Sequence, residues 1–201
     1  MPPRVVSAEE LLAATITIID RDGEAAVRVR DVCEACGITA PVLYSHFENR
    51  DALIVAAQAK RYNDARLVFL DIFKKMFADI NDRDTFVTTL TRFLPLHLDA
   101  GRAAHRALRT SVLGSVIGRP DLAAAIAEAD RHYTSALREV LGEAQSRGWI
   151  RPDIEVGALG LWWVSVVDGR FHMEHFDTGV EPADWDFVAL EAARQIGRAH
   201  V

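Results

Sequence analysis

The spacing of apolar residues restricts the fold of this chain more than any other feature of its sequence. Nearly every segment repeats its apolar residues at intervals of three and four, and no stretch alternates convincingly as a half-buried strand does. The first such stripe consists of Leu11, Leu12, Thr15, Ile16, Ile18 and Ile19. The pattern predicts an all-α fold, in which a module of short helices precedes a body of longer helices.

Length and charge limit the class of protein. The 201 residues suit one large or two small domains, and 50% of them are hydrophobic, as in an ordinary globular protein. The formal net charge is −6, so any contact with nucleic acid has to use a local patch. The longest apolar run, Val156–Val167, has 12 residues, whereas a membrane span needs about 20. We therefore expect a cytoplasmic protein with no membrane partner.

Capping residues and glycines set the expected helix boundaries. Ser7 and Glu10 form a capping box at the start of the first helix, and Gly23 ends it. Thr39 and Asn49 are expected to cap the third and fourth helices. The other expected helices cover about residues 30–36, 50–69, 83–99, 103–117, 121–147, 155–174 and 182–198.

Residues 30–47 have the layout of a helix-turn-helix. Gly37 stands between two short helices and allows the left-handed backbone that reverses the chain. We expect Ile38, Leu43 and Phe47 to face inward, which leaves Tyr44 on an outer face. The second helix of this motif is the one that enters the major groove of DNA.

The same residues carry a family resemblance. Residues 29–53 read VRDVCEACGITAPVLYSHFENRDAL and resemble the DNA-binding signature of the tetracycline-repressor (TetR) family of bacterial transcriptional regulators. The resemblance is close over about residues 7–60. It implies a homodimer that binds a palindromic operator in double-stranded DNA, and a pocket for a small-molecule effector that controls DNA affinity. We expect a DNA-binding domain at residues 1–50 and a ligand-binding and dimerisation domain at residues 51–201, with no cofactor.

The resemblance also implies roles for individual residues. Thr39, Tyr44 and Arg50 would hold phosphates, and Ala40, Val42 and Ser45 would face base edges. The full candidate set for DNA binding is Arg28, Arg30, Thr39, Ala40, Pro41, Val42, Tyr44, Ser45, His46 and Arg50. Residues 1–66 contain eight Lys/Arg against ten Asp/Glu, a local net charge of −2, although DNA readers ordinarily gather basic residues. This acidity motivates an alternative, a helical ligand-binding or scaffold protein whose degenerate head binds no DNA.

Apolar and aromatic residues of the body provide two further sets of candidates. An apolar or aromatic effector would be bound by Phe69, Phe73, Phe93, Leu94, His97, Arg109, Leu113, Tyr133 and Trp162. The last two helices would form a four-helix dimer interface. Its candidates are Trp163, Val167, Phe171, Trp185, Val188, Ala192 and Ile196.

Two pairs of metal-ligating residue types have alternative interpretations. Cys33 and Cys36 can form a redox or metal pair, or fill two small apolar sites, and the second interpretation is favoured because no other cysteine exists. His172 and His175 lie one helical turn apart, but two ligands do not make a metal site, so polar contacts are favoured. No Ser-His-Asp arrangement, phosphate loop or carboxylate pair is identifiable by spacing, so we expect no enzyme.

Overall fold

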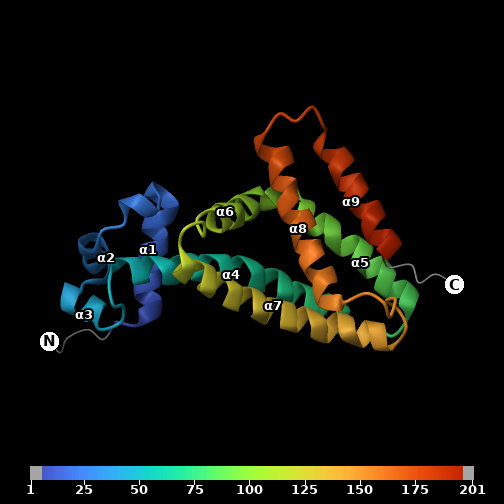
Figure 1. The fold of residues 1–201 in the computed structure, drawn as a ribbon, viewed down its shortest axis with the longest axis horizontal. Helices are drawn as coiled ribbons and strands as arrows, with labels where there is room; N and C mark the ends of the chain where they lie inside the picture. The colour runs from blue at the N-terminus through green and yellow to red at the C-terminus, as the bar shows by residue number, and fades with distance from the viewer. Residues whose placement is uncertain (1–5, 197–201) are drawn as a thin grey trace. The chain divides into compact units, whose positions relative to one another are not determined.

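All regular elements of the described residues are helices, as the apolar spacing predicts. The computed structural model describes residues 6–196, with side chains up to residue 195. The α-helices are α1 (Ala8–Asp22), α2 (Val29–Cys36), α3 (Ala40–Tyr44), α4 (Arg50–Phe77), α5 (Arg83–Leu98), α6 (Ala103–Gly114), α7 (Pro120–Ser146), α8 (Val156–His175) and α9 (Pro182–Ile196) (Figure 1). Short 3₁₀ helices occupy Glu24–Ala26 and Ala100–Arg102.

The chain divides into two compact units. The first, the head, contains the described residues up to Asp64 together with Ser115–Ala129, and the second, the body, contains the rest. Both α4 and α7 contribute residues to each unit. The sequence-based division at residue 50 concerns function and stays a prediction.

Local signals in the sequence explain how the head begins. The capping box of α1 is present: the Glu10 amide donates to Ser7 Oγ at 3.2 Å, and the Ser7 amide donates to Glu10 Oε2 at 2.9 Å. Gly23, with φ of 84°, ends the helix as predicted. Asn49 caps α4, because its side-chain oxygen accepts from the Ala52 amide at 2.8 Å. Thr39 is the N-cap residue of α3, as predicted, but its side chain makes no capping hydrogen bond.

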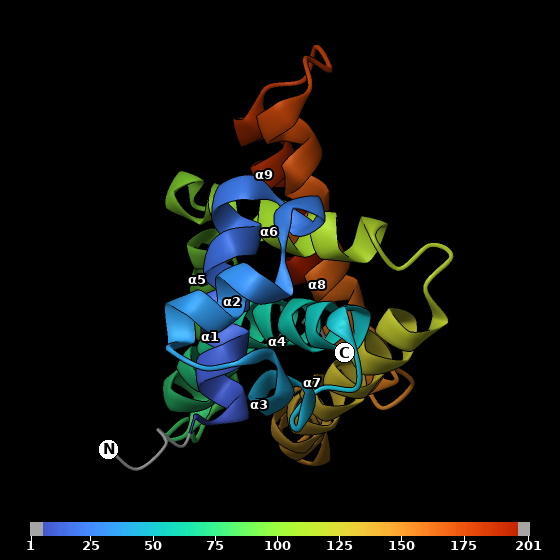
Figure 2. The same cartoon turned by 90° about the vertical axis from the view of Figure 1, so that its left-hand side faces the viewer.

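The helix-turn-helix is formed by α2, Gly37 and α3. Gly37 adopts φ of 66° and ψ of 37°, the left-handed conformation that an unbranched glycine adopts at low cost. The buried Leu43 of α3 joins a core that includes Leu11, Val32 and Leu53, all with no exposed surface. Ile38 and Phe47 cover the same core from its edge, as predicted. Figure 2 shows α1, α2 and α3 grouped together.

Phenylalanines dominate the core of the body. Phe73, Phe77, Phe86 and Phe93 are buried together, with ring centroids 4.4 Å to 6.3 Å apart in the contacting pairs. A neighbouring cluster joins α5, α8 and α9 through buried residues including Leu94 and Val167.

Buried arginines connect the helices of the body. Arg106 of α6 is 1% exposed; its Nε donates to Glu174 at 3.0 Å and its guanidinium also donates to the backbone oxygens of His97 and Asp99. Arg170 of α8 donates to Asp186 of α9 at 2.7 Å. These bonds offset the cost of burying charge, because each guanidinium has a carboxylate partner.

No helix within residues 6–196 is long and apolar enough to cross a membrane.

Candidate nucleic-acid interface and effector cavity

Helix α3 presents one buried side and one exposed side. Leu43 anchors it in the core, whereas Val42 is 36% exposed and Tyr44 is 47% exposed. Thr39, Pro41, Ser45 and His46 are exposed as well, and Ala40 is half-buried. The Ser45 hydroxyl donates to the Val42 carbonyl oxygen at 2.7 Å. The predicted reading surface is therefore open to solvent, and its short side chains allow close approach of a duplex.

The three predicted cations of the head differ in how freely they can reach a phosphate. Arg30 has a side chain that is 87% exposed, and it pairs with Asp31 at 3.2 Å. Arg28 donates to the backbone oxygens of Ala25 and Val27. Arg50 is half-buried, and its Nε donates to the Val27 oxygen at 2.9 Å. The Arg50 guanidinium thus secures the segment before α2, a role that the sequence could not reveal; its phosphate contact stays a prediction.

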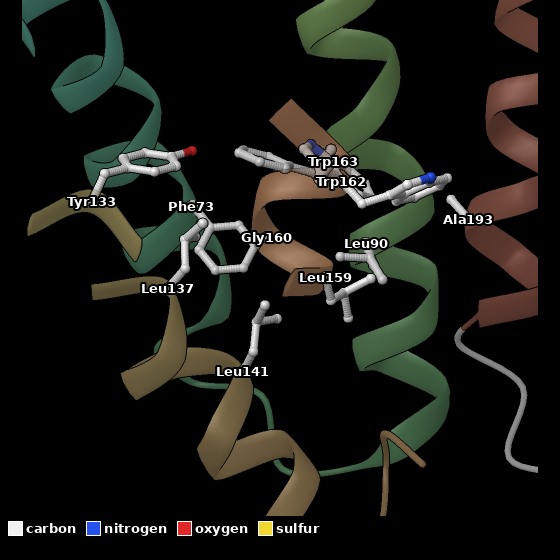
Figure 3. Close-up of a pocket in the computed structure, with 11 residues that line it drawn as sticks. Phe73, Leu90, Tyr133, Leu137, Leu141, Leu159, Gly160, Trp162, Trp163 and Ala193 are labelled. Atoms are coloured by element: carbon white, nitrogen blue, oxygen red, sulfur yellow. The ribbon is translucent and has the colours of Figure 1, made fainter. Parts of the chain in front are cut away.

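An apolar cavity lies inside the body. Side chains from α4, α5, α7, α8 and α9 point into it (Figure 3), and it encloses about 500 Å³ of empty space including its mouth. Its walls are Phe73, Leu90, Phe93, Tyr133, Leu137, Leu141, Leu159, Gly160, Trp162, Trp163 and Ala193. Four of these, Phe73, Phe93, Tyr133 and Trp162, are predicted effector residues. The leucines were missed because spacing alone cannot separate cavity walls from solid core.

A second, smaller cavity, with about 240 Å³ of empty space including open solvent at its mouth, is more polar. Its walls are Arg66, Phe69, His97, Arg109, Tyr133, Trp163, Val164 and Val167. Phe69, His97 and Arg109 are further predicted effector residues. Tyr133 and Trp163 belong to the walls of both cavities. The smaller cavity therefore forms a polar extension beside the apolar one.

Two ion pairs border the polar cavity. Arg109 donates to Asp168 Oδ2 at 2.6 Å, and Arg66 pairs with Asp130. Burial raises the pKa of Asp168 above its ordinary value, although the neighbouring Arg109 and Arg66 oppose that shift. Arg66 also lies over the Tyr133 ring, 4.9 Å from its centroid. Each buried cation is thus matched by one carboxylate.

His97 is the buried imidazole of the polar cavity. Burial lowers its pKa to about 4, against a smaller opposing effect of its hydrogen bond to the Phe93 carbonyl oxygen. Because that carbonyl only accepts, Nδ1 at 3.0 Å carries the proton and Nε2 keeps a lone pair. The ring centroids of Phe69 and Phe93 are 4.0 Å and 4.2 Å away. His97 is therefore an uncharged wall of the cavity at neutral pH.

Two predicted effector residues lie elsewhere. Leu94 of α5 is 1% exposed. It packs with Val167 of α8 and Ala189 of α9 instead of lining a cavity. Leu113 is half-buried on α6 and lines neither of these two cavities.

The predicted dimer residues also separate into inner and outer sets. Val167 is 3% exposed and Trp163 lines both cavities, so these two side chains are used inside the chain. Trp185 packs against Gly169, where an added Cβ would lie 2.8 Å from the indole. Val188 is 65% exposed. Phe171 and Ala192 are half-buried, and the side chain of Ile196 lies outside the described residues.

The cysteine pair of the head and the histidine pair of α8 have different surroundings. Cys33 and Cys36 are both buried free thiols in the head core. His175 is exposed and stacks on Phe171 with ring centroids 4.1 Å apart. Within residues 6–196 no three His, Cys, Asp or Glu side chains gather as metal ligands would.

A helix-turn-helix with its second helix exposed defines a class, the helix-turn-helix DNA-binding proteins. Residues 11–57 match the family described as "Bacterial regulatory proteins, tetR family". The HTH-type transcriptional regulator UidR of Escherichia coli K12 is 25% identical over 144 residues, 72% of this chain and 69% of UidR. The chain is thus similar to transcriptional regulators of the TetR family.

Solved structures share the fold at lower identity. A structure from Rhodococcus sp., described as TetR-family, is similar with a TM-score of 0.68 at 20% identity, covering 95% of this chain and 98% of that one. FadR from Bacillus subtilis, solved in complex with stearoyl-CoA, has a TM-score of 0.60 at 14% identity, covering 96% and 100%. The predicted all-α fold is confirmed over nearly the whole chain.

Proposed function

We propose that this regulator represses transcription as a cytoplasmic homodimer on a palindromic operator, and that a small apolar or aromatic effector releases it. The observation that carries the proposal is the exposed side of α3, with Val42 and Tyr44 presented to solvent on the buried anchor Leu43. Major-groove readout needs this combination, since a recognition helix has to be rigid on one side and open on the other. Thr39 and Tyr44 would hold phosphates in this complex.

Two helices supply a route from effector to DNA. Helix α4 carries the cavity residues Phe69 and Phe73 and, nearer its start, Gln58 of the head. Helix α7 carries Tyr133, and the residue just before it, Arg119, also belongs to the head. A ligand that shifts either helix therefore acts on the head through continuous backbone. A coupling of about 1–3 kcal/mol is usual for such regulation.

Within the head, Glu24 receives both of these connections. Its carboxylate accepts from Gln58 Nε2 at 2.7 Å and from Arg119 at 2.7 Å. Burial alone would raise the pKa of Glu24, but the hydrogen bonds from Gln58 and Arg119 outweigh it and hold the pKa below its ordinary value. The carboxylate is thus charged at neutral pH and ties α4 to the segment before α7.

The outer side of α8 and α9 is the proposed dimer surface. Leu161 of α8 and Phe187 and Val188 of α9 are 43%, 63% and 65% exposed, and covering such apolar side chains with a second copy would remove them from water. A double substitution of Phe187→Glu and Val188→Glu is expected to convert the dimer to a monomer in light scattering. A wild-type protein that is monomeric at micromolar concentration would contradict the proposed assembly.

Footprinting on the promoter beside the regulator's own gene tests the DNA-binding function. Two protected half-sites about 34–36 Å apart are expected, one for each α3. The alternative, a ligand-binding or scaffold protein with a degenerate head, is motivated by the local charge of −2, from eight Lys/Arg and ten Asp/Glu in residues 1–66. Absence of a band shift at low salt with micromolar protein would favour that alternative.

A further inference from the structure

Three buried polar atoms, two on residues of the polar cavity and one on the carboxylate paired with it, have no hydrogen-bond partner among the described residues. They are Nε of Arg109, Nε1 of Trp163 and Oδ1 of Asp168. Arg109 is 5% exposed and lines the cavity together with Trp163. Asp168 is bound to Arg109 through its other oxygen at 2.6 Å. An unsatisfied buried polar group costs about 1–3 kcal/mol, so these atoms favour a ligand that satisfies them.

The chemistry of the three atoms indicates which ligand group can bind them. Two of them are N–H donors and the third is a carboxylate acceptor. A hydroxyl group carries two acceptor lone pairs and one donor, which matches that set. A ligand carboxylate offers acceptors alone and would face the Asp168 carboxylate. An ammonium offers donors alone and would face the Arg109 guanidinium.

The charges around the cavity favour an uncharged ligand as well. Arg109 is balanced by Asp168, and Arg66 by Asp130. His97 is neutral, since its pKa is about 4. Because both arginines that line the cavity are paired, the lining has no unpaired charge to offset the desolvation of a charged headgroup.

The larger cavity determines which chemical class the rest of the ligand belongs to. Its walls are almost entirely apolar, with leucines from α5, α7 and α8. Figure 3 shows the Tyr133 hydroxyl directed toward the middle of the cavity from α7. Because Tyr133 and Trp163 line both cavities, a ligand that turns these two side chains can extend from one cavity into the other.

We propose that the effector is an uncharged amphiphile, a phenol or alcohol whose apolar body fills the larger cavity and whose hydroxyl binds Arg109, Trp163 and Asp168. This inference rests on the proposed function, because it names the ligand class for the same cavity.

Calorimetric titration of the full chain with three matched probes tests the ligand class. para-Octylphenol is expected to bind at least tenfold more tightly than octylbenzene, which lacks the hydroxyl, and than para-octylbenzoate, which is charged. Failure of para-octylphenol to bind, or binding no tighter than either other probe, would overturn the proposal.

A pair of tryptophan variants tests the subsite. Trp163→Phe removes one donor while keeping an aromatic ring, and Trp185→Phe is the matched control, because its Nε1 is also buried and without a partner but lines neither cavity. Trp163→Phe should weaken para-octylphenol by roughly 2- to 12-fold, the range for one hydrogen bond, and leave octylbenzene unchanged. Equal weakening of both probes, or of both variants, would refute the assigned hydroxyl contact.

A band shift separates this inference from the proposed function. Should para-octylphenol bind as expected without changing operator affinity, the ligand class stands and the effector role fails. Should the protein bind no operator at all, the calorimetric result still decides the ligand class by itself.

Discussion

The head and the body of this protein bury their residues in different ways. The head core is mainly aliphatic, with Leu11, Leu43 and Leu53 wholly covered. The body buries arginines such as Arg106 and Arg109 and has an apolar cavity lined by aromatic rings and leucines. A close-packed core holds one conformation, whereas a cavity with matched charges leaves room for a ligand and for rearrangement. This difference agrees with the proposed functions, in which the head binds DNA and the body binds an effector.

The largest expected loss of stability comes from the buried charges of the body. Arg106→Ala leaves Glu174 buried beside Arg170 with its main partner removed. Breaking a buried pair in this way costs about 3–5 kcal/mol of unfolding free energy, measured by urea denaturation. Replacing both Arg106 and Glu174 with Leu should recover part of that loss. The error of such measurements is about 1 kcal/mol. If the unfolding free energy of Arg106→Ala lies within that error of the wild-type value, this pair does not hold the body together.

The next largest effect separates packing from DNA reading within α3. Leu43→Ala should cost about 2–5 kcal/mol, because Leu43 is fully buried in the head core. The adjacent Val42→Ala should stay within about 0.5 kcal/mol of wild type and lower operator affinity instead. Urea denaturation and a band shift measure the two readouts. Equal loss of stability in both variants would contradict the exposed reading surface.

Acid titration tests the buried His97 of the body. The folded protein disfavours the charged imidazole, so the stability that neutral His97 contributes is present above pH 6.5 and is lost as pH falls through 6.5 toward about 4. Between pH 7 and pH 5 the loss is on the order of 2 kcal/mol. His97→Gln should remove that part of the pH dependence in urea denaturation. The raised pKa of Asp168 acts in the opposite direction, since protonation relieves its buried charge.

The smallest expected effect lies at the first turn of the head. Ser7→Ala removes the hydroxyl that accepts the Glu10 amide, and should cost about 1 kcal/mol. Thr39→Ala is the matched control, because Thr39 occupies the same position before α3 without a capping bond. Thermal unfolding of the two variants compares them directly. An equal loss in both would mean that the capping bond of Ser7 adds nothing measurable.

Much of the head could be read from local sequence. Ser7, Gly23, Gly37 and Asn49 set boundaries through bonds or dihedrals formed within a few residues. Such interactions are encoded by neighbours in the chain, so the helix-turn-helix and its inward Leu43 were predictable. Thr39 takes the predicted N-cap position but forms no side-chain bond, because local propensity permits that bond without requiring it.

Only the tertiary structure shows what the side chains of α8 and the buried arginines contact. Helix α8 is apolar around most of its circumference, so no periodic stripe shows that Trp163 lines cavities while Leu161 faces solvent. The partner of Arg106 lies 68 residues away on another helix. The sequence determined which segments are helical and where they start, because those choices are local. Which face meets a cavity, a core or solvent depended on the packing of helices distant in the chain.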